Sequence, residues 1–128
     1  MWKELCFLPA TELAAMIRTR QVSAFEVMQA HLAQIERVNP KVNAIVTLDV
    51  EGALAHARSM DEKQARGEEL GPLHGLPIAH KDLFLTRGLR TTMGSPIFQD
   101  YVPERSMLVV DRAWDACANS IGKTTTPE

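Results

Sequence analysis

The spacing of apolar residues in the first third of the chain predicts two helices. The first is expected from about residue 11 to residue 19, with its apolar side chains on one face. The second should begin after Ser23, because Ser23 and Glu26 have the spacing of a capping box. It should stop at Asn39 and Pro40, since the residue before a proline avoids the helical conformation. Its core-facing stripe consists of Phe25, Met28, Leu32 and Ile35.

A strand and a third helix are expected next. Residues 42–48, VNAIVTL, are short and rich in β-branched side chains, which favours a strand. Asp49 can cap a helix that follows directly and runs to about Arg66. Gly67 is expected to end that helix.

The second half of the chain has a different pattern. Residues 71–95 are rich in glycine, proline and threonine, which predicts loops and short strands, including PIAH (77–80) as a strand that enters the core. A helix over about 105–116 and a strand at 119–122 should follow. The helix should turn three residues toward the core, namely Val109, Val110 and Ala113. Helices that alternate with short strands indicate an α/β fold with a mixed, partly parallel sheet flanked by helices.

Composition narrows the possible functions. The 128 residues are enough for one domain, and 14 basic residues nearly balance 16 acidic ones, which argues against direct nucleic-acid binding. The N-terminus does not have the pattern of a secretory signal, and no apolar run is long enough to span a bilayer. The two cysteines and four histidines lack metal-site spacing. We therefore expect a cytoplasmic protein with reduced thiols, no membrane contact, no metal and no cofactor.

The stretch GPLHGLPIAHKDLF, residues 71–84, places a lysine at the end of an apolar strand, with an aspartate immediately after it. The ordinary interpretation is that the stem of Lys81 lies along apolar surface while its ammonium group stays in water or pairs with Asp82. The alternative is functional. A lysine removed from water favours its neutral form, and a neutral amine can act as a general base. Composition and periodicity do not decide between the two.

Three segments decide in favour of function, because together they resemble the amidase signature family. They are GPLHGLPIAHKD, RTTMGS (90–95) and GKTTTPE (122–128). The segment TELAAMIRTRQVSAFEVMQAHLAQIERVNPKVNAIV is also similar to the opening helices of that family, so the resemblance covers essentially the whole chain.

The resemblance implies the N-terminal portion of a single amidase domain, incomplete in this chain. Within residues 1–128 we expect a helical opening (1–66), a catalytic-lysine segment (71–95) and a closing helix and strand (104–128). The polypeptide also stops directly after a strand and a turn, which indicates the first part of a longer protein.

The same resemblance implies a mechanism. The family cleaves carbon–nitrogen bonds of linear amides with a Ser–cis-Ser–Lys triad, and its lysine matches Lys81. In the family both serines lie further along the chain, and Ser95, Ser106 and Ser120 match neither of them. A small-molecule amide is therefore the expected substrate, Lys81 is the one expected catalytic residue, and the 128-residue chain alone is expected to be inactive.

Several positions depart from the family pattern and leave alternatives open. Cys117 stands where relatives usually have glycine, so it is expected to need a positive φ, and Asn119 and Ser120 replace apolar strand residues and need polar partners. One alternative is the glutaminase of a tRNA-dependent amidotransferase, its A subunit, which works with partner subunits. Another is a non-catalytic truncated remnant. A homodimer is also compatible with the amidase interpretation.

Overall fold

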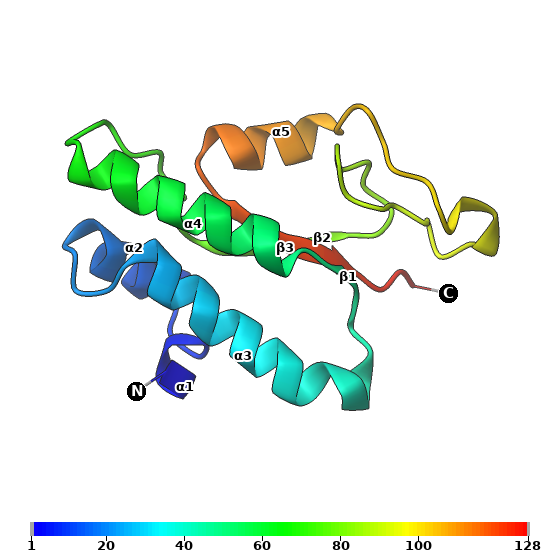
Figure 1. Ribbon diagram of the computed structural model, residues 1–128, viewed down its shortest axis with the longest axis horizontal. Helices are drawn as coiled ribbons and strands as arrows, with labels where there is room; N and C mark the ends of the chain where they lie inside the picture. The colour runs from blue at the N-terminus through cyan, green and yellow to red at the C-terminus, as the bar shows by residue number, and fades with distance from the viewer. Residues whose placement is uncertain (1, 128) are drawn as a thin grey trace.

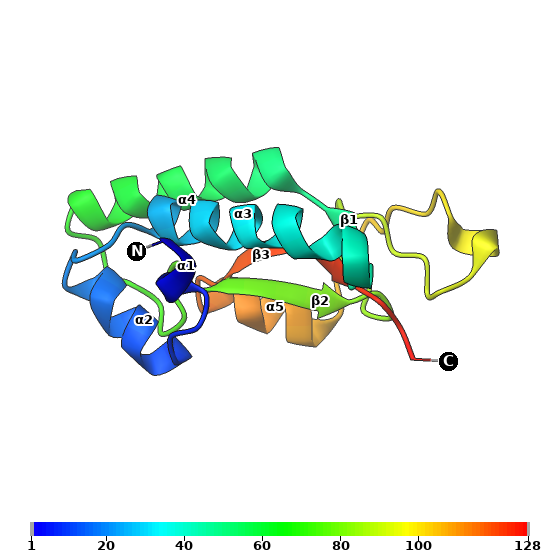
Figure 2. The ribbon, with the colours of Figure 1, turned by 90° about the horizontal axis from the view of Figure 1, so that it is seen from below.

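The computed structural model describes residues 2–127 as a three-stranded sheet with helices on both faces (Figure 1). The strands lie in the order β1-β3-β2, with β1 antiparallel and β2 parallel to the central β3. Figure 2 shows α3 and α4 over one face of the sheet and α5 on the other. In chain order the elements are α1 (Trp2–Leu5), α2 (Ala10–Arg18), α3 (Ala24–Val42), β1 (Ile45–Leu48), α4 (Val50–Ala65), β2 (Pro77–Lys81), the 3-10 helix η1 (Pro96–Phe98), α5 (Leu108–Asp115) and β3 (Asn119–Thr124).

This arrangement confirms the α/β class and the mixed sheet. Among residues 2–127, no helix has the length and apolar character needed to cross a bilayer.

Two groups of buried apolar side chains hold the helices in place. The larger group joins α3 and α4 to β3, and the members that form it are Ala24, Met28, Leu32, Ala53, Ala57, Met60 and Ile121. The second group packs α2 against the other side of α3, through Leu13, Ile17, Val22 and Val27. The stripe expected on α3 is confirmed, since Met28 and Leu32 are buried and Phe25 and Ile35 pack against the larger group.

The expected end of α3 is wrong by two residues. The helix continues through Pro40 to Val42, and Asn43 ends it in the left-handed conformation with a φ of 48°. A proline in the last turn costs little, because few residues of the helix follow it. The Asn39 side chain then accepts a hydrogen bond from the backbone N–H of Ile45 and donates one to the Ile45 carbonyl. The strand therefore begins at Ile45, later than the sequence predicted.

The start of α5 also differs from the expectation. The helix begins at Leu108 because the Met107 N–H donates to the Leu85 carbonyl at 2.9 Å, and this contact holds residue 107 in an extended conformation. The shift changes which side chain reaches the core. Val110 is fully buried, whereas Val109 is 55% exposed, so the prediction that Val109 faces the core is wrong.

The central strand β3 leaves no room for a side chain at Gly122. A Cβ atom added there would lie 2.0 Å from the carbonyl oxygen of Thr47 on β1. In the β2–β3 pairing, the register shifts between Ile78 and Ala79, opposite this glycine. β2 lies at an edge of the sheet, and His80 is the only one of its residues that is buried, so PIAH enters the core less deeply than predicted.

Candidate active site

Lys81 is the last residue of β2, where it pairs in register with Thr124 of β3. Its side chain is half-buried. Within residues 2–127, no hydrogen bond or ion pair involves the Lys81 ammonium group. The neighbouring Asp82, which the ordinary interpretation offered as a partner, is engaged elsewhere.

Asp82 is 1% exposed and is held by donors from the following loop. Its carboxylate accepts from the backbone N–H of Thr92 at 3.2 Å and from the Thr92 hydroxyl group. Its main chain is fixed as well, because the Asp82 N–H donates to the Thr124 carbonyl at 2.9 Å and the Met93 N–H donates to the Asp82 carbonyl at 3.0 Å. One carboxylate oxygen also lies 3.6 Å from Nζ of Lys123.

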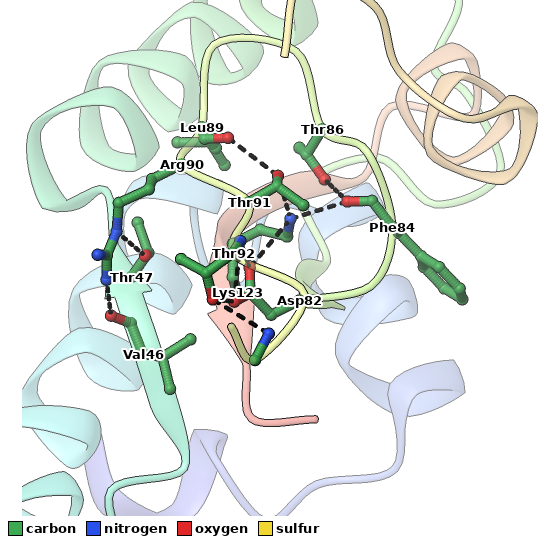
Figure 3. A network of polar contacts seen from close by, with 11 residues as sticks. Val46, Thr47, Asp82, Phe84, Thr86, Leu89, Arg90, Thr91, Thr92 and Lys123 are labelled. Atoms are coloured by element: carbon green, nitrogen blue, oxygen red, sulfur yellow. Dashed lines mark hydrogen bonds and ion pairs between the residues drawn. The ribbon is translucent and has the colours of Figure 1, made fainter. Parts of the chain in front are cut away.

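Lys123 is the fully buried lysine of this region, with none of its surface exposed. Figure 3 shows its ammonium group inside the loop that follows β2. Nζ donates to the Phe84 carbonyl at 2.8 Å and to Oγ1 of Thr91 at 2.7 Å. Burial lowers the pKa of Lys123, and the attraction and hydrogen bonding of Asp82 oppose that shift. With acceptors on several sides, the buried cation has the partners that it requires.

Hydroxyl groups and Arg90 complete the loop that surrounds Lys123. Thr91 donates its own hydroxyl hydrogen to the Leu89 carbonyl at 3.1 Å, so its oxygen is free to accept from the ammonium group. Arg90 ties the loop to β1, because its guanidinium donates to Thr47 Oγ1 at 3.2 Å and to the Val46 carbonyl at 3.3 Å (Figure 3). The loop is thus joined to two strands of the sheet.

Sequence reasoning missed Lys123 because it placed residue 123 beyond the end of the last strand. The strand runs instead to Thr124, which brings Lys123 opposite His80 of β2. No local pattern marked Lys123, because the burial of Asp82 and its pairing with Lys123 are evident only in the structure.

Ser120 of β3 finds polar partners, whereas Asn119 finds one for its side-chain N–H and none for its buried Oδ1 among residues 2–127. Ser120 Oγ accepts a hydrogen bond from the indole N–H of Trp114 at 2.6 Å and lies 2.8 Å from Nε2 of His80. Because a serine hydroxyl can accept two hydrogen bonds and donate one, Ser120 can serve both Trp114 and His80. Burial, and then the nearby Lys123, lower the pKa of His80. Asn119 donates to the Ala53 carbonyl at 3.0 Å.

Cys117 confirms the expectation of a positive φ. Its φ is 67°, a conformation that costs little for glycine and more for a residue with a Cβ. The thiol lies 3.8 Å from Nζ of Lys63, a contact on α4 rather than in the Lys81 region. The cysteine at position 117, where relatives usually have glycine, therefore strains the backbone locally and does not change the Lys81 region.

The three serines considered in the sequence analysis have structural partners instead of Lys81. Ser95 accepts from the Ile97 N–H at 3.3 Å and caps η1. Ser106 accepts from the Arg87 N–H at 2.8 Å. With Ser120 bound to His80, none of these three serines is hydrogen-bonded to Lys81.

A large apolar cavity of about 860 Å³ lies away from this site. Side chains of α3, β1 and the first half of α4 line it, among them Leu32, Ile35, Leu48 and Leu54. Lys81 does not line this cavity. Lys81, Asp82 and Lys123 are therefore separate from the apolar cavity.

Comparison with known proteins defines the family. The sequence model of the Amidase family matches residues 26–128, so this chain belongs to that family. It is 47% identical over 121 residues to the A subunit of the glutamyl-tRNA(Gln) amidotransferase of Streptomyces coelicolor, a match that covers 94% of this chain and 24% of the relative. The corresponding protein of Acidothermus cellulolyticus is 49% identical over 119 residues, or 93% of this chain and 24% of the relative.

Solved structures agree with this assignment. The native peptide amidase from Stenotrophomonas maltophilia has 30% sequence identity and a TM-score of 0.82, and the match covers 90% of this chain and 24% of that one. The chain therefore spans about a quarter of the length of the relatives that it matches. This share agrees with the predicted N-terminal portion of an amidase signature fold.

Proposed function

We propose that this chain supplies the catalytic-lysine portion of an amidase-family enzyme that hydrolyses linear amides, with Lys81 as the general base. The observation that carries the proposal is the state of the Lys81 side chain. It stands at the end of a strand, half-buried and without an ion-pair partner among residues 2–127, while the adjacent carboxylate of Asp82 is bound by Thr92 and Lys123. The Lys81 amine is therefore left without a carboxylate partner among these residues.

The proposed reaction follows the Ser–cis-Ser–Lys scheme of the family resemblance. The neutral amine of Lys81 takes a proton from the bridging cis-serine, which takes one from the nucleophilic serine. That serine attacks the amide carbonyl, and the proton passes to the leaving amine as the carbon–nitrogen bond breaks. Water then hydrolyses the acyl-enzyme, and backbone N–H groups near the nucleophile stabilise the oxyanion.

The 128-residue chain alone is expected to have no amidase activity. Ser95 and Ser106 are used as local hydrogen-bond acceptors, and Ser120 is the partner of His80. Both serines of the triad must therefore come from the remaining part of an amidase fold. In this proposal the enzyme works in the cytoplasm, on a small-molecule amide.

A second candidate is favoured by the identity of the relatives. The two relatives at 47% and 49% identity each belong to a glutamyl-tRNA(Gln) amidotransferase. In this version the amide is glutamine, the released ammonia passes to a misacylated tRNA, and partner subunits hold the tRNA. The balanced charge of this chain agrees with a polypeptide that does not itself bind nucleic acid.

The test joins residues 1–128 to the part of the Streptomyces coelicolor relative that follows its matched segment. This joined enzyme and the 128-residue chain are assayed side by side for ammonia release from glutamine and from simple linear amides. The proposal predicts turnover by the joined enzyme and none by the chain alone. Release from glutamine only would favour the amidotransferase version. A joined enzyme that folds and hydrolyses none of these amides would contradict the proposal.

A further inference from the structure

The loop that follows β2 is built around a cation that belongs to a different strand. Residues 82–93 leave β2 at Asp82 and return at Met93, whose N–H donates to the Asp82 carbonyl at 3.0 Å. Lys123 of β3 fills the space inside this closed loop and donates to Phe84 and Thr91. Lys123 lies 32 residues after Thr91 in the sequence. The side chain that fills the loop therefore comes from a distant part of the chain.

We propose that Lys123 is a positioning residue that holds the loop 82–93 and, through it, the end of β2 from which Lys81 projects. The significance of this role for catalysis rests on the proposed function of Lys81. The link is short, because Asp82 follows Lys81 directly and is itself bound by Thr92, Lys123 and the Thr124 carbonyl. If the loop opens, the last residues of β2 lose these constraints together.

The chemistry of the pair explains why a lysine is needed at position 123. Asp82 is 1% exposed and Lys123 is fully buried, so removing one partner leaves the other as an uncompensated buried charge. A neutral side chain of similar length, such as methionine, would fill the space without donating to Phe84, Thr91 or Asp82. Removing both charges together avoids the unpaired charge and is the matched compensating change.

The first experiment uses the 128-residue chain and needs no activity. The chain is labelled for short times with an amine-reactive ester, and mass spectrometry gives the labelling rate of each lysine. Lys81 is half-buried in the parent chain, and its labelling rate there is the reference for each variant. In Lys123→Met, the rate at Lys81 should rise about fivefold or more as the end of β2 opens. In Asp82→Asn/Lys123→Met, it should return toward the parent rate.

Lys63 separates local opening from general unfolding. It is half-buried on α4, and its hydrogen bond is to Cys117. Global unfolding would raise the labelling of Lys63 and Lys81 together, whereas loss of positioning raises the rate at Lys81 alone. The proposal is overturned if Lys123→Met leaves the Lys81 rate unchanged, or raises it only in proportion to that of Lys63.

The second experiment measures the catalytic consequence in the joined enzyme. Lys123→Met should lower kcat per titrated active site by about tenfold or more while KM changes little, because substrate contacts are not removed and only the base is misplaced. Lys41→Met is the control and should leave both constants unchanged. A Lys123→Met enzyme with parental kcat would overturn the positioning role, even if Lys81 proves essential. If Lys81 itself proves dispensable, the proposed function fails while the labelling result still decides the inference.

Discussion

The carboxylate of Asp61 completes the N-terminus of α3 from a different helix. Its two oxygens accept from the backbone N–H groups of Ala24 at 2.8 Å and Phe25 at 3.0 Å. Ser23 and Glu26 form the capping box beside them, in which each side chain accepts from the other residue's N–H. Every N–H of the first turn of α3 therefore has a side-chain acceptor, and two of them depend on Asp61.

We expect Asp61→Ala to destabilise the chain by about 2 kcal/mol, since two backbone donors lose a charged acceptor at a helix N-terminus. Ala24 is fully buried, so water cannot easily replace the lost partner there, whereas Asp61 itself is half-buried and its contribution is reduced accordingly. For a chain of this length the change corresponds to a decrease in Tm of about 7 °C.

The measurement is thermal and urea denaturation of the 128-residue chain, followed by circular dichroism. Glu62→Ala is the matched control, because Glu62 is the exposed neighbour of Asp61 on α4. The control should change the free energy of unfolding by less than about 0.5 kcal/mol. If Asp61→Ala lies within that same range, the carboxylate does not support α3 and the reasoning is wrong.

Two further predictions concern histidine and backbone strain. Because burial lowers the pKa of His80, the unfolded chain binds more protons than the folded chain below about pH 6.5, so stability should be full above that pH and fall as the pH decreases. Urea midpoints at about pH 7.5 and about pH 5.5 should differ less in His80→Gln than in the parent, and an equal difference would contradict this. Cys117→Gly should raise the free energy of unfolding by about 1 kcal/mol by relieving the positive φ, whereas Cys117→Ala, which keeps the Cβ, should give no such gain in urea denaturation.

Helix starts were predictable because their signals are local. Ser23 with Glu26, and Asp49 with its bond to the Gly52 N–H at 3.0 Å, are capping residues within three positions of their partners. Asp61 caps the same turn as Ser23 from 37 residues away, and no local pattern indicates such a contact. The start of α5 was missed for a related reason, because a distant carbonyl group holds Met107 in an extended conformation.

Lys81 was singled out by its place after an apolar strand and by the family resemblance, and its catalytic role stays a prediction. The role of Lys123 depends on the parallel pairing of β2 with β3 and on the extension of β3 to Thr124. Both features belong to the tertiary structure, so the sequence did not indicate that Asp82 binds Lys123 instead of Lys81.

The most direct test of the account is Lys81→Met in the joined enzyme, with Lys41→Met as a control that removes an exposed lysine. General-base catalysis contributes about 10²–10⁴-fold to a rate, so kcat should fall within or beyond that range while the Tm stays close to that of the parent. A Lys81→Met enzyme that turns over its amide within about threefold of the parent rate, a change far too small for the loss of a general base, would contradict the assignment of Lys81.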